Sequence, residues 1–205
     1  VRMQAGDLKE NLSLGHGLHP LQYLITLGTS LSGPNTVIRL LTRLSPTLPA
    51  AMVVIQEIAP QILPAFVKKF NEHVPWHVEV ARDGLVLEQG VCYICSNTQS
   101  LSIERNESDQ PCIRLSNAVD QPLNKLFISA AQVFRQNTIG VLLTGIGDDG
   151  ADGFARIRDY NGNTIAQDTQ CCVYPNLTHN AIEKGTVRKV DTENQLPGAI
   201  EAGMA

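Results

Sequence analysis

The sequence has few aromatic residues, little net charge and no long apolar run. Aromatics make up 5% of its 205 residues, and the formal charge of -4 is spread over residues of both signs without a basic stripe. A nucleic-acid surface needs clustered Lys and Arg, so we expect no nucleic-acid partner. No segment approaches the roughly 20 apolar residues of a membrane span, and the N-terminus has no secretory signal pattern. We therefore expect a cytoplasmic protein without membrane insertion.

Cysteine is also scarce. Five cysteines are an odd number for a disulfide framework, and we expect them to be reduced. Cys92 and Cys95 form a C-x-x-C pattern in an alternating stretch typical of a strand, where residues three apart point to opposite faces. Cys171 and Cys172 are adjacent and would also face apart in an extended segment. The strand pattern favours buried structural thiols over a redox pair for Cys92 and Cys95. At Cys171 and Cys172 we expect no metal site.

The sequence does contain a regular alternation of β-rich and helical segments. Residues 1–20 lack a sustained period, so we expect a linker or N-terminal extension there and one domain over residues 21–205. The alternation predicts an α/β fold with a doubly wound, mostly parallel, Rossmann-like sheet in three layers. Between residues 84 and 115, short strands joined by turns predict a small antiparallel β flap. Its predicted strands are LVLEQG, VCYIC, SLSIER and CIRLS.

Three loops follow apolar runs and lie at the carboxyl ends of predicted parallel strands, where reactive groups gather in such sheets. They are GTSLSGP at 28–34, QEIAP at 56–60 and TGIGDDGADG at 144–153. A serine one turn before a helix, as at Ser30, lies where backbone N–H groups stabilise an oxyanion. The same residue types also cap helices, so Ser30 has a structural alternative, as have Asp149 and Asp152 as caps of the following helix. The acidic loop lacks the glutamate of an EF-hand, which argues against calcium.

The first and third of these loops match the motifs of a known family. A first loop of the form G-x-S-T-G-G-P is matched at Gly28, Ser30, Gly33 and Pro34. A late loop of the form L-T-G-M-G-x-D-G-A is matched over residues 143–151, with Ile146 at the methionine. In these motifs and in the order of elements, the chain resembles the catalytic domain of the chemotaxis receptor methylesterase family, CheB. The resemblance covers residues 21 to about 190 and predicts a methylesterase-like catalytic domain over residues 21–205.

The resemblance implies an activity and a set of site residues. It implies a serine hydrolase that demethylates glutamyl methyl esters on chemoreceptors and, in related cases, deamidates glutamine. By the resemblance, Ser30 is the nucleophile and Asp149 orients the base, and no metal or other cofactor is needed. The expected partners are the methylated cytoplasmic tails of chemoreceptors and a phosphoacceptor receiver domain. The oxyanion loop would comprise Thr29, Leu31, Gly145 and Ile146.

The sequence departs from the family at the general base. The family places a histidine after the second strand, in V-Q-H-M-P-P, and Glu57 occupies that position here. An imidazole with a pKa near 6.5 suits base catalysis at neutral pH, whereas a free carboxylate near 4.3 does not. Loss of a triad member can leave only the roughly 10³ to 10⁴-fold acceleration of oxyanion stabilisation and binding. We take His179 as the candidate substitute base, since its loop would border the cleft; the alternative is an exposed histidine at the start of a helix.

Two alternatives stand beside the family activity. In one, Ser30, Glu57 and Asp149 supply the residue types of the acid-active serine-carboxyl peptidases, in which a glutamate is the base. In the other, the chain is a catalytically impaired binding module that recognises receptor tails on the same scaffold.

Overall fold

A computed structural model describes residues 19–31, 33–117 and 120–204. The predicted extension over residues 1–20 lies outside these residues except for its last two. The strands are β1 (Tyr23–Gly28), β2 (Ala50–Gln56), β3 (His77–Val80), β4 (Val91–Ser96), β5 (Ser100–Arg105), β6 (Pro111–Ser116), β7 (Thr138–Leu142), β8 (Asn163–Gln167) and β9 (Lys189–Asp191). The helices are α2 (Gly33–Arg43), α3 (Leu63–His73), α4 (Pro122–Phe134), α5 (Ala151–Asp159), α6 (Asn176–Glu183) and α7 (Leu196–Ala202), with short 3-10 turns η1 (Arg135–Asn137) and η2 (Thr169–Cys171).

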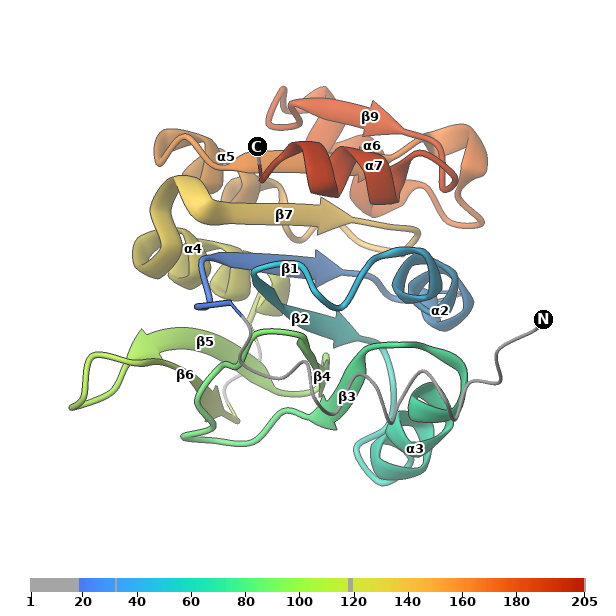
Figure 1. Cartoon of the computed structure of the whole chain (residues 1–205). Helices are drawn as coiled ribbons and strands as arrows, with labels where there is room; N and C mark the ends of the chain where they lie inside the picture. The colour runs from blue at the N-terminus through green and yellow to red at the C-terminus, as the bar shows by residue number, and fades with distance from the viewer. Residues whose placement is uncertain (1–18, 32, 118–119, 205) are drawn as a thin grey trace.

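The main sheet confirms the predicted fold class. Its seven strands are parallel and lie in the order β3-β4-β2-β1-β7-β8-β9. From β1 the chain adds β2, continues to β3 at the edge of the sheet and inserts β4 between β3 and β2; it then returns to add β7 on the other side of β1. The carboxyl ends of β1 and β7 therefore flank the point where the strand order reverses, which is where ligands bind in open α/β sheets. The arrows of β1, β2, β7 and β9 point to the same side in Figure 1.

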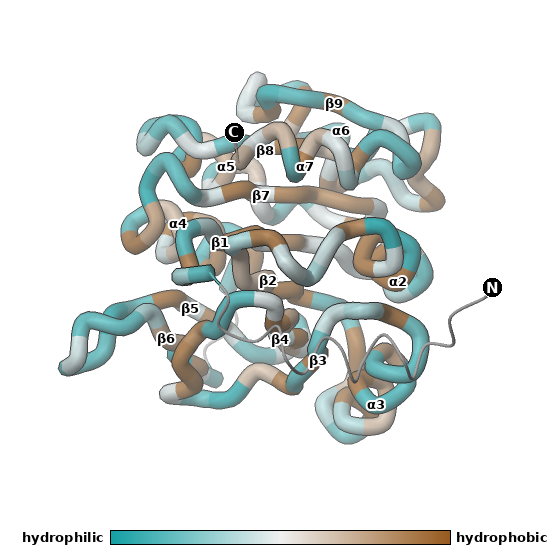
Figure 2. Tube along the Cα trace, in the orientation of Figure 1, coloured by the Kyte–Doolittle hydropathy of each residue, from teal (hydrophilic) through white to brown (hydrophobic). Residues whose placement is uncertain are grey.

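The sheet separates two apolar cores. Helices α2, α3 and α7 cover one face, where Phe70 and Trp76 are buried. Helices α4, α5 and α6 cover the other face together with β5 and β6, and there the Phe127 and Phe154 rings pack with centroids 5.0 Å apart. Figure 2 shows the hydrophobic residues concentrated along the central strands. Because both faces are covered, the strands are continuous apolar runs.

The predicted flap is wrong in two of its four strands: LVLEQG forms no strand and contributes only an isolated bridge at Val86, and VCYIC lies elsewhere. The segment VCYIC forms β4, which lies in the main sheet between β3 and β2 and is parallel to both. The antiparallel unit consists of β5 and β6, with a bridge from Val86 to Cys112. Tertiary packing decides this: Cys92 joins one core and Cys95 the other, so β4 is buried on both faces as a central strand must be. The expectation that these two thiols face apart is confirmed.

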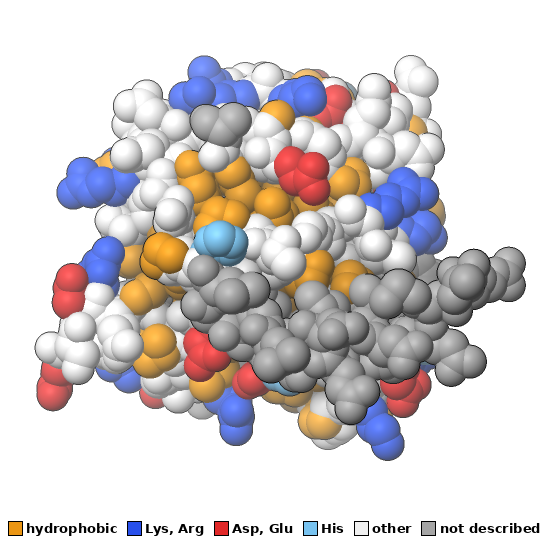
Figure 3. Space-filling model, viewed as in Figure 1, with side chains coloured by type: hydrophobic (Ala, Val, Ile, Leu, Met, Phe, Trp, Pro, Cys, Tyr) orange, Lys and Arg blue, Asp and Glu red, His pale blue; other side chains and the backbone are white. Residues whose placement is uncertain are grey.

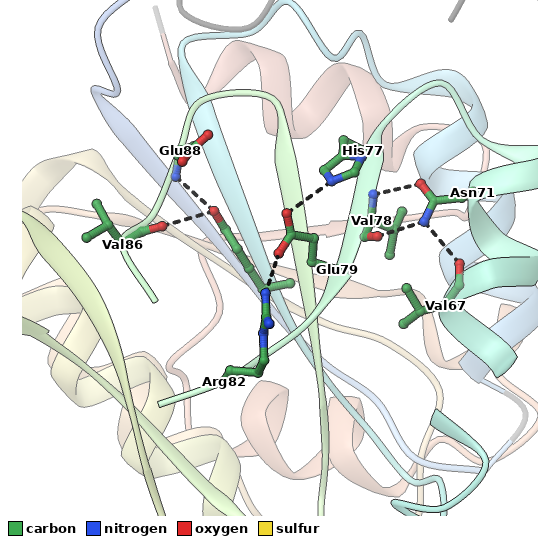
Figure 4. A network of polar contacts seen from close by, with 9 residues as sticks. Val67, Asn71, His77, Val78, Glu79, Arg82, Val86 and Glu88 are labelled. Atoms are coloured by element: carbon green, nitrogen blue, oxygen red, sulfur yellow. Dashed lines mark hydrogen bonds and ion pairs between the residues drawn. The ribbon is translucent and has the colours of Figure 1, made fainter. Parts of the chain in front are cut away.

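The outer edge of β3 is blocked by a side chain. The Asn71 amide donates to the carbonyl of Val78 at 2.7 Å and accepts from its N–H at 3.0 Å, so α3 closes part of the edge (Figure 4). On the same strand, Glu79 forms ion pairs with His77 at 3.0 Å and with Arg82 at 3.4 Å. An edge strand occupied in this way is a poor template for pairing with another chain.

Charged side chains are dispersed over the face drawn in Figure 3. Outside the grey atoms, Lys, Arg, Asp and Glu lie at scattered positions with no continuous patch of one sign. Among the described residues, no helix has both the length and the apolar composition to cross a membrane.

Candidate active site

Two loops meet where the strand order reverses. The loop after β1 carries Ser30, and its hydroxyl Oγ accepts a hydrogen bond from the backbone N–H of Ile146, in the loop after β7, at 2.8 Å. The Thr29 hydroxyl donates to the carbonyl of Thr144 at 2.7 Å, and the Ser30 N–H donates to the same carbonyl at 3.3 Å. Three hydrogen bonds thus hold the serine loop against the late loop. The two motifs that the sequence singled out form one junction.

The serine turn is supported from the neighbouring strand. The Ser30 carbonyl accepts from the Gly33 N–H at 3.2 Å and from the side-chain amide of Gln56 at 2.8 Å. On the other side, Gln167 accepts from the N–H of Thr144 at 3.0 Å. The sequence patterns did not predict a role in the site for either glutamine. Each is the last residue of a buried apolar strand, and a polar side chain at that position is the pattern that would have identified them.

Close approach of the two loops requires glycine at position 145. A Cβ built on Gly145 would lie 2.8 Å from Ser30 Oγ and 2.3 Å from the Leu177 side chain. Neither distance is compatible with a real Cβ contact, so a side chain here would push the serine loop or α6 away. In the predicted oxyanion loop, the backbones at Ser30 and Gly145 therefore lie close together. Its side chains Leu31 and Ile146 point outward, 42% and 50% exposed.

Asp149 caps a helix, but not the helix that the sequence predicts. Its two carboxylate oxygens accept from the N–H groups of Leu123 at 2.7 Å and Asn124 at 3.0 Å, at the start of α4. The following helix α5 is capped by Asn124 instead, whose side-chain oxygen accepts from the N–H groups of Gly150 at 3.1 Å and Gly153 at 2.7 Å. The expectation that Asp149 or Asp152 caps α5 is therefore wrong. Asp149 and Asn124 cap each other's helices, which locks the late loop onto α4.

Burial controls the ionisation of Asp149. Desolvation raises the pKa of this carboxyl, and the charge of Asp148 acts in the same direction. Hydrogen bonds from backbone N–H groups at the starts of α4 and α5 oppose the rise because they stabilise the charged form.

Neither base candidate is hydrogen-bonded to the serine hydroxyl in the part of the chain that the structure describes. Glu57 follows β2 and is exposed, and no hydrogen bond or ion pair of its carboxylate is found within the described residues. His179 lies in the first turn of α6 with its side chain 60% exposed and pairs with Glu183 at 3.2 Å, which fits the alternative of an exposed histidine at a helix start. Over the described part of the chain, Ser30 Oγ has no hydrogen bond to Glu57, Asp149 or His179. The structure therefore joins the serine to a backbone donor and not to a base.

The thiols of Cys92 and Cys95 are buried, as the sequence predicts. Cys112 is buried too, and desolvation raises the pKa of Cys95 to about 12. Cys171 is exposed, and Cys172 is partly buried. In the described residues, no three His, Cys, Asp or Glu side chains are grouped closely enough to hold a metal ion.

Comparisons with known proteins match most of the chain. The family model of the CheB methylesterase matches residues 25–200. A protein-glutamate methylesterase/protein-glutamine glutaminase 3 of Syntrophomonas wolfei is 33% identical over 78% of this chain and 47% of that protein. The corresponding enzyme of Pyrococcus horikoshii is 27% identical over 88% of this chain and 50% of that protein. The chain thus spans about half the length of these relatives.

Among solved structures, the CheB methylesterase catalytic domain of Thermotoga maritima matches with a TM-score of 0.81 and 24% identity. The match covers 87% of this chain and 96% of that domain. At this identity, the likeness establishes the fold.

Proposed function

The chain belongs to the CheB methylesterase family, and we propose that it is a serine hydrolase that demethylates glutamyl methyl esters on chemoreceptors. The named relatives are protein-glutamate methylesterases and protein-glutamine glutaminases, so glutamine deamidation is part of the proposal. One observation carries it: Ser30 Oγ lies 2.8 Å from a backbone N–H at the carboxyl edge of the sheet. A nucleophile beside a fixed donor is the arrangement that acyl transfer uses.

In the proposed reaction, Ser30 Oγ attacks the ester carbonyl and methanol leaves, which forms a glutamyl ester on the serine. Water then hydrolyses this intermediate and releases the glutamate side chain. The Ile146 N–H, which donates to the serine hydroxyl in the free protein, would donate to the oxyanion when the substrate carbonyl is present. Thr29 and Gly145 hold this donor in place: the Thr29 hydroxyl bonds to the Thr144 carbonyl, and the lack of a side chain at Gly145 lets the two loops approach. Leu31 follows Ser30 in the same loop. A preorganised donor of this kind typically contributes 10² to 10³-fold to turnover.

For the base, we propose Glu57, with His179 as the substitute candidate. Glu57 follows β2, the strand paired with β1, so it leaves the sheet beside the serine loop. His179 is on α6, whose first turn contacts the late loop through a hydrogen bond from the Leu177 N–H to the Gly145 carbonyl at 3.2 Å. Asp149, bonded to the start of α4, holds the late loop in register in this proposal. A carboxylate base keeps its activity at acidic pH, where an imidazole is protonated and inactive.

The proposed partners follow from family membership. They are the methylated cytoplasmic tails of chemoreceptors, together with a phosphoacceptor receiver domain as regulatory partner. A cytoplasmic location goes with these partners and is part of the same proposal.

The test is hydrolysis of methylated receptor peptides between roughly pH 4 and 9 by this chain and its variants. We expect Ser30→Ala to abolish turnover and, with Glu57 as the base, Glu57→Gln to abolish it as well, because an amide cannot accept the serine proton. Ser108→Ala, in the exposed turn between β5 and β6, is the matched control and should leave turnover unchanged. A serine-reactive fluorophosphonate should label the native chain and not Ser30→Ala.

Two results would redirect the assignment. Turnover that persists in Ser30→Ala would remove Ser30 as nucleophile. An inactive native chain that gains activity in Glu57→His would support the binding module, a methylesterase scaffold that lost its base.

A further inference from the structure

Two adjacent cysteines, Cys171 and Cys172, follow β8, and we call them the cysteine pair. Cys171 ends the 3-10 turn η2 and is exposed, whereas Cys172 is partly buried in extended backbone. The Cys172 sulfur lies 3.7 Å from the Thr178 hydroxyl of α6, and desolvation raises the pKa of this thiol. The other three cysteines of the chain are buried. A reagent in solution therefore reaches the Cys171 thiol first.

The peptide bond between the two cysteines is held by Gln167. The Cys171 carbonyl belongs to this peptide bond and accepts from the side-chain amide of Gln167 at 3.1 Å. The oxygen of the same side chain, which is 1% exposed, accepts from the Thr144 N–H at 3.0 Å. The Thr144 carbonyl in turn accepts from the Ser30 N–H at 3.3 Å. One buried side chain therefore connects the cysteine pair to the late loop that contacts Ser30.

Tyr174, two residues beyond the cysteine pair, makes a second connection to the late loop. Its N–H donates to the Thr144 hydroxyl at 3.0 Å, and its carbonyl accepts from the Gly145 N–H at 2.8 Å. The next residue, Ile146, supplies the backbone donor of the serine hydroxyl. A backbone change at the cysteine pair would therefore displace bonds at the two residues that precede this donor.

We propose that Cys171 and Cys172 are oxidised by a peroxide to a reversible vicinal disulfide, which lowers the reactivity of Ser30. The ring that this disulfide closes contains the peptide bond between the two cysteines. Since one thiol is exposed and the other is turned toward α6, closure has to rotate this peptide unit and withdraw its carbonyl from Gln167. The effect on Ser30 rests on the proposed function, whereas the disulfide itself does not.

The oxidation is balanced with one hydrogen peroxide. The Cys171 thiolate attacks a peroxide oxygen, the O–O bond breaks, and the leaving hydroxide takes up a proton to form water. The Cys172 thiolate then attacks the sulfur of the resulting sulfenic acid, its S–O bond breaks, and a second water forms. Adjacent Cα atoms are about 3.8 Å apart, below the roughly 4.4–6.8 Å usual for disulfides, so a thiol reductant should reopen the ring.

The first test is chemical. The reduced chain is treated with a stoichiometric amount of hydrogen peroxide and unfolded, and its thiols are counted with Ellman's reagent. We expect the count to fall from five to three, the peptide that contains the cysteine pair to lose two hydrogen atoms by mass spectrometry, and dithiothreitol to reverse both changes. In Cys172→Ser, Cys171 should stop at the sulfenic acid and react with dimedone. A count that stays at five, or a disulfide that joins two chains, would overturn the proposal.

The second test measures the connection to Ser30. Oxidation should slow fluorophosphonate labelling of Ser30 by about three- to tenfold, as expected for the loss of one hydrogen bond, and dithiothreitol should restore the rate. Cys171→Ser is the control, and it should label at the rate of the reduced native chain with and without peroxide. The Thr144 amide hydrogen should exchange faster in the oxidised chain, because Gln167 loses its second partner.

The outcomes separate this proposal from the proposed function. An oxidised chain in which labelling and exchange of the Thr144 amide are both unchanged would refute the connection to Ser30. If Ser30 is labelled in neither state, the proposed function fails, and the thiol count, the mass and the amide exchange still decide whether the disulfide forms and reaches the late loop.

Discussion

The reciprocal caps of Asn124 and Asp149 make a quantitative prediction about stability. Asn124 is 5% exposed, and its side-chain oxygen accepts hydrogen bonds from two backbone N–H groups at the start of α5. The Asp149 carboxylate accepts from two backbone N–H groups at the start of α4. Removing an Asn or Asp cap typically costs about 0.5–2 kcal/mol. Because each side chain here satisfies two buried amides, we expect Asn124→Ala and Asp149→Ala each to lower the free energy of unfolding by about 2 kcal/mol.

The two losses should not add, because either change releases the same junction between α4 and the late loop. We expect the double variant to lose about 3 kcal/mol, a coupling of about 1 kcal/mol. Urea unfolding followed by circular dichroism measures all four proteins. Asn106→Ala is the matched control: this side chain caps the exposed β5–β6 turn through the Ser108 and Gln110 N–H groups, and its loss should add to that of Asp149→Ala. Additivity of the Asn124 and Asp149 losses within about 0.5 kcal/mol would refute the reciprocal cap.

Three further predictions concern the same region. Gln56→Leu removes the amide that holds the Ser30 carbonyl, so fluorophosphonate labelling of Ser30 should slow by up to about tenfold, and an unchanged rate would contradict this support. Gly145→Ala should lower the melting temperature by roughly 4–8 °C for about 2 kcal/mol of overpacking, whereas Gly198→Ala, whose Cβ would meet nothing within 4 Å, should not lower it. Ellman's reagent at pH 8 should modify the exposed Cys171 at once and the buried Cys95 only on unfolding. The raised pKa of Cys95, about 12, leaves little of its thiolate at pH 8. Simultaneous modification of the two thiols would be inconsistent with the fold.

Several features were predictable from the sequence because they depend on local order along the chain. The alternation of apolar strands with amphipathic helices predicts a parallel doubly wound sheet, since each crossover needs a helix to return the chain. The same order places Ser30, Glu57 and the late loop after strands, and therefore at one edge of the sheet. The motifs around Ser30 and Asp149 then identified the family.

Other features depend on which segments meet, and local sequence does not encode that. VCYIC has the composition of any buried strand, and only its insertion between β3 and β2 shows that it is part of the main sheet. Asn124 lies 25 residues before Asp149 in the chain, and their exchange of caps requires α4 and α5 to begin side by side.

The sequence by itself determined the fold class, the family and the position of the serine, because periodicity and motif spacing are properties of neighbouring residues. The tertiary structure decided the partners of the functional groups: Ser30 with the Ile146 N–H, Asp149 with α4, and Glu57 left facing solvent. Hydrogen bonds act over about 3 Å, so a side chain's partner is set by packing between distant segments and not by its place in the chain.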